Sequence, residues 1–302
     1  MRISSNRLLN FADKNVVITG TSSGMGAEAL GRFLRAGASV DALDINPDAG
    51  PDVDSDLAAD SEVAAEGRGE PSGGTCRSHR VDIGDRESID LGIDRLPDRI
   101  DVLVNCAGIP NGGRFSGEQV MRVNWLGLRH LTEALLPRME GGGSVVHVAS
   151  TAGRDWAARV ADHRRLMAAS TFDEGLAWLA TNADVYGDGY VFSKEAVQYY
   201  TLWRSVQLLP RGVRMNSVCP GITDTSLITD FRKGLGDEVI DHAQAVVGRI
   251  AQPGEMAPAM LFLADNESSS YINGVNLNVD NGSNAARASD QSDPELIWGS
   301  AD

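Results

Sequence analysis

The chain has 302 residues, a formal net charge of −15 and only three cysteines. This acidic balance argues against a nucleic-acid or anionic-membrane surface, because a polyanion would be repelled. No stretch approaches the roughly 18 apolar residues of a membrane helix. Cys76, Cys106 and Cys219 are odd in number and far apart, which predicts free thiols in a reducing cytoplasm. Five scattered histidines predict no metal site, and a small organic substrate fits best.

Short apolar runs alternate with helical patterns along most of the chain. Strands are expected at residues 15–20, 38–44, 78–81, 102–105, 144–149, 213–218 and 275–279. Helices are expected at about 25–36, 86–96, 117–139, 190–209, 225–233, 237–247 and 255–263. This order predicts one α/β domain over residues 1–302, a Rossmann-type doubly wound parallel sheet of about seven strands. Residues 47–75 are expected to form a solvated surface insertion, and residues 283–302 a polar, loosely ordered tail.

A glycine-rich turn separates the first strand from the first helix. Glycines at this place let the backbone approach a pyrophosphate at the helix N-terminus. Lys-Ser or Lys-Thr does not follow the last glycine, which argues against a P-loop. A Gly/Ser turn taken alone is more often only a turn. If it binds a dinucleotide, its cofactor residues are Gly20, Ser22, Ser23, Gly24, Met25 and Gly26.

Carboxylate and amide side chains end the neighbouring strands. Asp44, followed by Ile45, ends the second strand, where a carboxylate accepts both adenosine ribose hydroxyls and repels a 2′-phosphate. NAD is therefore favoured over NADP, although an Asp that caps a turn is an equally good reading of the position alone. Asp41 is a weaker candidate because it projects to the other face. The fourth strand ends in Asn105, and Ala107 and Gly108 follow, at the edge where cofactors bind.

The sharpest pattern is Tyr190 and Lys194, four residues apart on one face of a predicted helix. A phenol has a pKa of about 10 and is a poor base at neutral pH unless a nearby cation favours the phenolate. Lys194 supplies that cation. An isolated pair with this spacing is usually incidental, but here it follows the glycine turn, Asp44 and Asn105 in order. The set predicts an acid/base centre.

This ordered set resembles the short-chain dehydrogenase/reductase family over roughly residues 12–282. The resemblance implies that Ser150 holds the substrate oxygen, that Asn124 bends its helix and holds a water linking Lys194 to solvent, and that Lys194 bonds the nicotinamide ribose. Thr21 stands where NADP users of the family often have a basic residue, which again favours NAD. By the same resemblance the adenine is contacted by Asp82 and Ile83, and the nicotinamide carboxamide by Pro220, Gly221, Ile222 and Thr223.

Ser150 and Tyr190 lie 40 positions apart, farther than in most of the family. The intervening residues 151–189 look helical over 154–179, where Thr171 and Glu174 form a capping-box pattern. This resembles the branch that contains 3α-hydroxysteroid dehydrogenase/carbonyl reductase and coniferyl-alcohol dehydrogenase. The likeness implies an insertion near the substrate cleft that obstructs a helix-pair interface; the alternative is a surface decoration remote from the cleft. A homodimer through the last helix and strand, or a homotetramer, is expected.

The expected reaction is hydride transfer between NAD(H) and a secondary or allylic alcohol or ketone. Trp125, Trp156, Trp178 and Phe192 suggest an apolar substrate of steroid, terpenoid or aryl-alcohol type, although such residues more often belong to the core. One alternative is a 3-oxoacyl thioester reductase, against which Asp44 argues. Another is a non-catalytic dinucleotide-sensing protein, against which the intact Tyr190 and Lys194 argue. His147 lies near Ser150 in the sequence, but we interpret it as a packing residue because strand alternation turns its side chain away from the predicted site.

Overall fold

The computed structural model describes residues 9–47, 73–112, 114–139, 141–294 and 297. Its centre is a parallel sheet in the order β3-β2-β1-β4-β5-β6-β7. The predicted doubly wound sheet of seven strands is confirmed. The strands are β1 (Asn15–Thr19), β2 (Ser39–Asp44), β3 (Thr75–Arg80), β4 (Val102–Asn105), β5 (Ser144–Val148), β6 (Arg214–Pro220) and β7 (Asn276–Val279).

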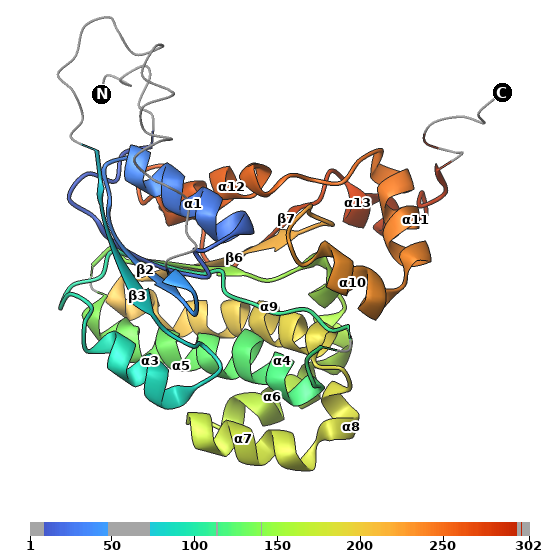
Figure 1. The fold of residues 1–302 in the computed structure, drawn as a ribbon, viewed down its shortest axis with the longest axis horizontal. Coiled ribbons are helices and arrows are strands. Elements are labelled where there is room, and N and C mark those ends of the chain that lie inside the picture. Colours follow the sequence, from blue (N-terminus) through green and yellow to red (C-terminus); the bar gives the residue numbers. More distant parts are fainter. Residues whose placement is uncertain (1–8, 48–72, 113, 140, 295–296, 298–302) are drawn as a thin grey trace, which may run out of the picture.

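Helices cover both faces of the sheet (Figure 1). The helices are α1 (Gly24–Arg35), α3 (Arg86–Ile93), α4 (Gly117–Met121), α5 (Leu128–Leu135), α6 (Val160–Ala168), α7 (Phe172–Thr181), α8 (Ala183–Tyr186), α9 (Tyr190–Gln207), α10 (Ile228–Leu235), α11 (Asp237–Val247), α12 (Ala257–Ala264) and α13 (Ser283–Ala288). On one face α1 and α12 pack together over the sheet, and α3, α5 and α9 cover the other. The central strands are apolar because parallel strands are buried on both faces.

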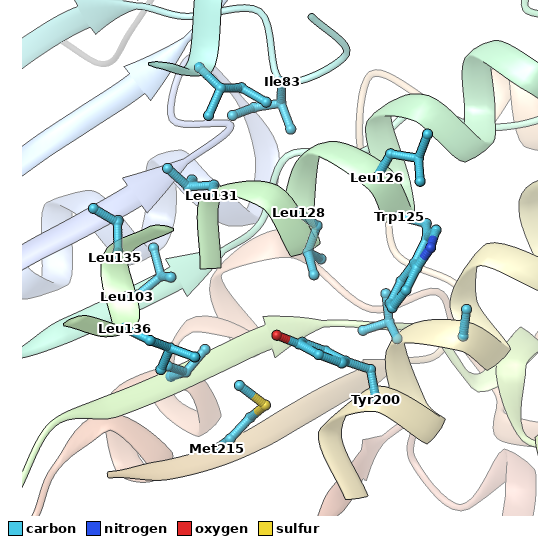
Figure 2. Packing of buried hydrophobic residues seen from close by; sticks show 14 of the residues in the cluster. Ile83, Leu103, Trp125, Leu126, Leu128, Leu131, Leu135, Leu136, Tyr200 and Met215 are labelled. Carbon is cyan, nitrogen blue, oxygen red and sulfur yellow. The ribbon is translucent and has the colours of Figure 1, made fainter. Parts of the chain in front are cut away.

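The larger apolar core lies between the sheet and the α3, α5 and α9 layer. Figure 2 shows Leu131 and Leu135 of α5 facing the strand residue Leu103, with Tyr200 of α9 and Met215 of β6 closing the cluster. All five side chains are fully buried. This packing fixes α9 against the sheet and therefore fixes the height of its first turn at the sheet edge.

The edge strand β3 differs from the apolar strand that the pattern predicts at 78–81. It begins at Thr75 and ends at Arg80, and most of its side chains are exposed. Its backbone pairs with β2 from Ser39 onward, so ladder pairing rather than hydrophobicity defines the strand. Most of the surface insertion predicted at 47–75 lies outside the described residues.

The single helix expected over 117–139 is divided by a π-helical turn, Arg122–Gly127. Gly127 is where the chain passes close to the segment after β3: a Cβ there would lie 1.7 Å from the carbonyl oxygen of Ile83. The turn contains Asn124, the residue at which the resemblance implied an irregular helix. π-turns inside helices occur often at functional sites.

The insertion between β5 and α9 packs on the outer face of α9. It forms α6, α7 and α8, and α7 begins with the predicted capping box of Thr171 and Glu174. In Figure 1 these helices lie below α9 and α4, on the side away from the sheet. Within 151–189 the cavity described below is lined by Thr151, Ala152, Arg154 and Asp155 alone. The first residues of the insertion therefore line the cavity, whereas its three helices do not.

Phe192 of α9 anchors the insertion. Its ring stacks on His163 with centroids 4.8 Å apart and on Trp178 at 5.9 Å, and the Arg159 guanidinium lies 4.4 Å above it. One turn along α9, the buried Glu195 carboxylate lies 3.3 Å from Arg159 and 3.4 Å from His163. Aromatic stacking and a buried ion pair thus hold the inserted helices to the back of α9.

The tail after Gly282 is more regular than the sequence predicts, since Ser283–Ala288 form α13. The Asp280 carboxylate accepts hydrogen bonds from the backbone N–H of Gly282 at 3.0 Å and of Asn284 at 2.8 Å. Asn281 adopts a left-handed φ of 49°, as expected of Asn in this turn. In the described part of the chain, every helix is too short or too polar to cross a membrane.

Replacing Phe192 by Ala is expected to lower the free energy of unfolding by about 3–5 kcal/mol, because a buried ring is lost and its partners cannot collapse into the space. Val206→Ala, at an exposed position of the same helix, is the control and should stay within about 0.5 kcal/mol. Chemical denaturation measures both values. Equal losses in the two variants would contradict the anchoring role of Phe192.

Candidate active site

A cavity of about 1650 Å³ opens at the carboxyl ends of the strands. It is lined by the glycine turn after β1, by Asp44 from β2, by Ala107 and Gly108 after β4, and by Ser150 after β5. The cavity is also lined by predicted site residues from other segments of the chain, namely Ile45, Asp82, Ile83, Tyr190, Lys194, Pro220, Gly221, Ile222 and Thr223. This is the edge at which parallel α/β sheets bind ligands.

The glycine turn has the backbone of an anion-binding loop. Gly20 and Gly24 have positive φ values of 76° and 58°. A Cβ on Gly26 would lie 2.0 Å from the Gly20 carbonyl oxygen, so only glycine fits. At the start of α1 the N-cap Ser23 makes no side-chain capping bond within the described residues, and the first turn has no acidic side chain. The N–H groups at this helix start are therefore free for a phosphate.

Asp44 fastens this turn to the second strand. One carboxylate oxygen accepts from the Ser22 N–H at 2.9 Å, and the other accepts from the Asn46 N–H at 2.9 Å. The carboxylate still lines the cavity, with lone pairs left for further donors. Thus Asp44 caps the turn and faces the cavity at once, so the two readings of the sequence are compatible.

Asp41 lies outside the cavity, as strand alternation predicts. Its buried carboxylate accepts from Arg77 at 2.7 Å and contacts His79 at 2.8 Å. Burial by itself would raise the pKa of Asp41, but the hydrogen bonds from Arg77 and His79 outweigh it and lower the pKa. Asp41 therefore ties β2 to β3.

Asn105 is a predicted cofactor residue whose side chain does not line the cavity. It is 2% exposed, and its Nδ2 lies 2.9 Å from the Thr132 hydroxyl and 3.1 Å from Nδ1 of His147. At the strand end the side chain turns into the core, where it joins β4 to α5 and β5. Burial, followed by the charge of Lys194, lowers the pKa of His147 to about 3, so this histidine is a neutral packing residue.

The turn after β4 is held by Thr19, which the sequence reading did not single out. Its hydroxyl accepts from the N–H of Cys106 and of Ala107, both at 3.0 Å. This joins the end of β1 to the start of the β4 turn and keeps both turns at one edge. The position of Thr19, directly before the first glycine and at the end of a buried strand, is the signal by which it could have been found.

Tyr190, Ser150 and Lys194 meet in the cavity. Tyr190 is the first residue of α9, and its backbone N–H donates to Asp188 at 3.1 Å. Ser150 lies close enough to the Tyr190 hydroxyl to lower its pKa. The Lys194 ammonium lies 5.9 Å from the centroid of the Tyr190 ring and donates to the Val148 carbonyl at 2.9 Å. The three predicted catalytic groups therefore share one wall.

Burial controls the protonation of both ionisable groups. It raises the pKa of Tyr190 to about 12, although the hydrogen bond with Ser150 acts in the opposite direction. Burial also lowers the pKa of Lys194 to about 8. Desolvation therefore dominates the pKa of the Tyr190 hydroxyl. Tyr190 is an acid at neutral pH and becomes a base only with additional positive charge nearby.

Asn124 supports the site from behind, and its side chain does not itself line the cavity. Its amide oxygen accepts from the Ile109 N–H at 2.8 Å, and its Nδ2 donates to the Ile109 carbonyl at 3.0 Å. A Cβ on the adjacent Gly108 would lie 3.3 Å from that amide oxygen and 3.6 Å from the Lys194 ammonium. Asn124 thus positions the loop that runs beside Lys194.

The apolar wall of the cavity comes from residues that the sequence reading missed. Phe231 of α10 packs edge-on against Tyr190, with ring centroids 5.0 Å apart, and an Arg114–Asp230 ion pair of 3.1 Å joins α10 to the loop after β4. The structure describes all four aromatic residues that suggested an apolar substrate, and none of them lines the cavity: Trp125, Trp156, Trp178 and Phe192. Trp125 and Phe192 belong to the core. Also within the described residues, no group of three His, Cys, Asp or Glu side chains is arranged for a metal ion.

Comparison with known proteins finds matches along the whole fold. The short chain dehydrogenase family model matches residues 14–161, and the enoyl-(acyl carrier protein) reductase model matches residues 179–284. A coniferyl-alcohol dehydrogenase from Pseudomonas sp. (strain HR199 / DSM 7063) is 36% identical over 91% of this chain and 98% of its own length. A 3-oxoacyl-[acyl-carrier-protein] reductase from Thermotoga maritima is 28% identical over 89% of this chain and 97% of its own.

Solved structures agree on the fold. Levodione reductase superposes with a TM-score of 0.68 at 23% identity and covers 92% of this chain and 100% of its own. A putative 2-deoxy-D-gluconate 3-dehydrogenase from Agrobacterium tumefaciens, with bound NADP, has a TM-score of 0.65 at 21% identity over 93% of this chain and 100% of its own. The order of its motifs, the topology of its sheet and these matches agree. The chain belongs to the short-chain dehydrogenase family of oxidoreductases, in the branch that includes coniferyl-alcohol dehydrogenase.

Proposed function

We propose that this protein is an NAD-dependent alcohol dehydrogenase whose substrate has a largely apolar body, with aryl allylic alcohols as the favoured class. The observation that carries the proposal is the meeting of Tyr190, Ser150 and Lys194 in a cavity that also contains Asp44. The substrate class rests on the 36% identical coniferyl-alcohol dehydrogenase and on the apolar wall around Phe231.

The residues of the cavity fit a nicotinamide dinucleotide. The turn before α1 suits its pyrophosphate, and the Asp44 carboxylate suits the hydroxyls of the adenosine ribose. The same carboxylate would repel the 2′-phosphate of NADP. Asp82 and Ile83 would contact the adenine, and Pro220, Gly221, Ile222 and Thr223 the nicotinamide end. When bound, the cofactor supplies a hydride acceptor and, in its oxidised form, a positive charge.

In the oxidative direction the substrate hydroxyl lies between Tyr190 and Ser150. Tyr190 takes the hydroxyl proton as a general base while Ser150 donates to the same oxygen as charge develops on it. The Lys194 ammonium stabilises the phenolate across the shared face of α9. In the reductive direction Tyr190 returns the proton as the acid, the role for which its raised pKa suits it.

A 3-oxoacyl thioester reductase is the second candidate. It is favoured by the reductase family model over residues 179–284 and by the Thermotoga maritima relative. NADPH preference and turnover of acetoacetyl thioesters would support it; Asp44 argues against it. A dinucleotide-sensing protein without turnover fits poorly with an intact Tyr190 and Lys194. A cytoplasmic location and a homodimer or homotetramer remain predictions from the sequence.

Replacing Tyr190 by Phe removes the hydroxyl that moves the proton, and kcat for alcohol oxidation should fall by about 10²–10⁴-fold. Tyr271→Phe, at a fully exposed position, is the control and should leave kcat unchanged. NADH formation from cinnamyl and coniferyl alcohols measures both. Undiminished turnover by the Tyr190 variant would rule out the mechanism.

The pH dependence has a defined sign because the pKa of Tyr190 is raised to about 12. Oxidation needs the phenolate, so kcat/KM for the alcohol should rise by about tenfold per pH unit below the apparent pKa of Tyr190 in the enzyme–NAD complex. Reduction needs the phenol and should stay flat over the same range. Opposite slopes, or flat profiles in both directions, would contradict Tyr190 as the acid/base group.

Asp44→Asn removes the charge and leaves a single acceptor oxygen, so it keeps one of the two backbone bonds of the turn. The KM for NAD should rise by about tenfold, because a hydrogen bond to a charged group is lost, and the ratio of NADP to NAD efficiency should increase. Asp94→Asn, at the exposed C-cap of α3, is the control. An unchanged cofactor ratio would refute the assignment of Asp44 to NAD selection.

A further inference from the structure

Two of the arginines that line the cavity come from segments that follow β5 and β7, away from the strand that carries the glycine turn. Arg154 follows Ser150 after a single 3₁₀ turn at the end of β5, and Arg287 belongs to α13 after β7. The glycine turn follows β1, from which β5 is two strands and β7 four strands away. At a strand spacing of about 4.8 Å these separations are roughly 10 and 19 Å. The arginines therefore belong to the substrate half of the cavity.

The start of α13 is held in place by side chains beside it. Asn281 donates to the Val247 carbonyl of α11 at 2.9 Å, and the Asp280 carboxylate accepts from the two backbone N–H groups named above. Asp280 thus serves the backbone. No carboxylate of the described residues makes an ion pair with Arg287. Arg287 is exposed to solvent, and its side chain lines the cavity from α13.

Arg154 is oriented as well. Its Nη1 donates to the Thr151 carbonyl at 2.9 Å, which holds the side chain over the turn that follows Ser150. Its neighbour Asp155 is 3.8 Å away with a side chain 66% exposed, so that ion pair contributes little. Burial and then the positive charge of Arg287 lower the pKa of Arg154, against the opposing charges of Asp155 and Asp280. An anion between them would relieve that repulsion.

We propose that Arg154 and Arg287 form a carboxylate-binding subsite, so that the substrate whose hydroxyl meets Tyr190 carries a carboxylate at its far end. This inference rests on the proposed dehydrogenase function and narrows its substrate class. Guanidinium groups match the planar geometry of a carboxylate and bind it with charge-assisted hydrogen bonds. The four residues from Ser150 to Arg154 rise by about 8 Å at the 3₁₀ spacing, comparable with the length of a para-substituted aromatic ring.

The net charge of −15 makes this subsite selective. An acidic protein repels small anions over most of its surface, so a carboxylate gains from the cavity only where local cations outweigh that field. The apolar wall around Phe231 takes the body of the substrate, and the paired arginines take its charged end. The expected substrate is therefore an apolar alcohol with one anionic group.

The test compares two alcohols that differ only in charge, para-carboxycinnamyl alcohol and its carboxamide. For Arg287→Gln and for Arg154→Gln, kcat/KM on the carboxylate should fall by about tenfold or more, chiefly through KM, because a charge-assisted bond is lost. Efficiency on the carboxamide should change less than about twofold. Arg165→Gln, an exposed arginine of α6, is the matched control and should alter neither. Equal losses on both alcohols, or no loss on the carboxylate, would overturn the proposal.

A binding measurement separates this subsite from the proposed reaction. Calorimetric titration with 4-methylbenzoate and 4-methylbenzamide, in the presence of NAD, needs no turnover. Arginine-dependent binding of the benzoate supports the subsite even if every alcohol fails to react, in which case the dehydrogenase proposal fails alone. Benzoate binding that persists unchanged in the Arg154→Gln, Arg287→Gln double variant refutes the subsite whatever the turnover.

Discussion

The first half of α9 is buried on all sides, and this constraint shapes the rest of the molecule. On one face Tyr190 and Lys194 point into the cavity, and on the opposite face Phe192 and Glu195 are held by the inserted helices. Neither face is free to move without disturbing the other. Desolvation of the same turn raises the pKa of Tyr190 and lowers that of Lys194. The packing that fixes the geometry therefore also sets the chemistry.

The insertion between β5 and α9 contributes to this burial. Its helices cover the back of α9 and leave the cavity to the first residues after Ser150. It thus covers one face of α9 with packed side chains. The part of the insertion that does reach the cavity contributes Arg154, which faces the tail helix α13 across the substrate half. Substrate recognition is assembled from two segments that the motifs of the family do not include.

The sequence was informative wherever a backbone requirement selects a residue type. Positive φ at Gly20 and Gly24 and the strand-end carboxylate Asp44 could be predicted because few residues satisfy those positions. The inward orientation of the Asn105 side chain could not be predicted, because the last residue of a strand can turn to either side and its partner His147 is 42 positions away. Phe231 was missed because its contact with Tyr190 depends on how α10 folds back, which no local pattern specifies.

The account's central claim is that an alcohol carbon gives its hydride directly to nicotinamide beside Tyr190. The most direct measurement oxidises cinnamyl alcohol labelled with deuterium at the carbinol carbon and locates the label by NMR. The account predicts deuterium at C4 of the reduced nicotinamide, on one face only. Deuterium released to solvent, or distributed over both faces, would contradict it.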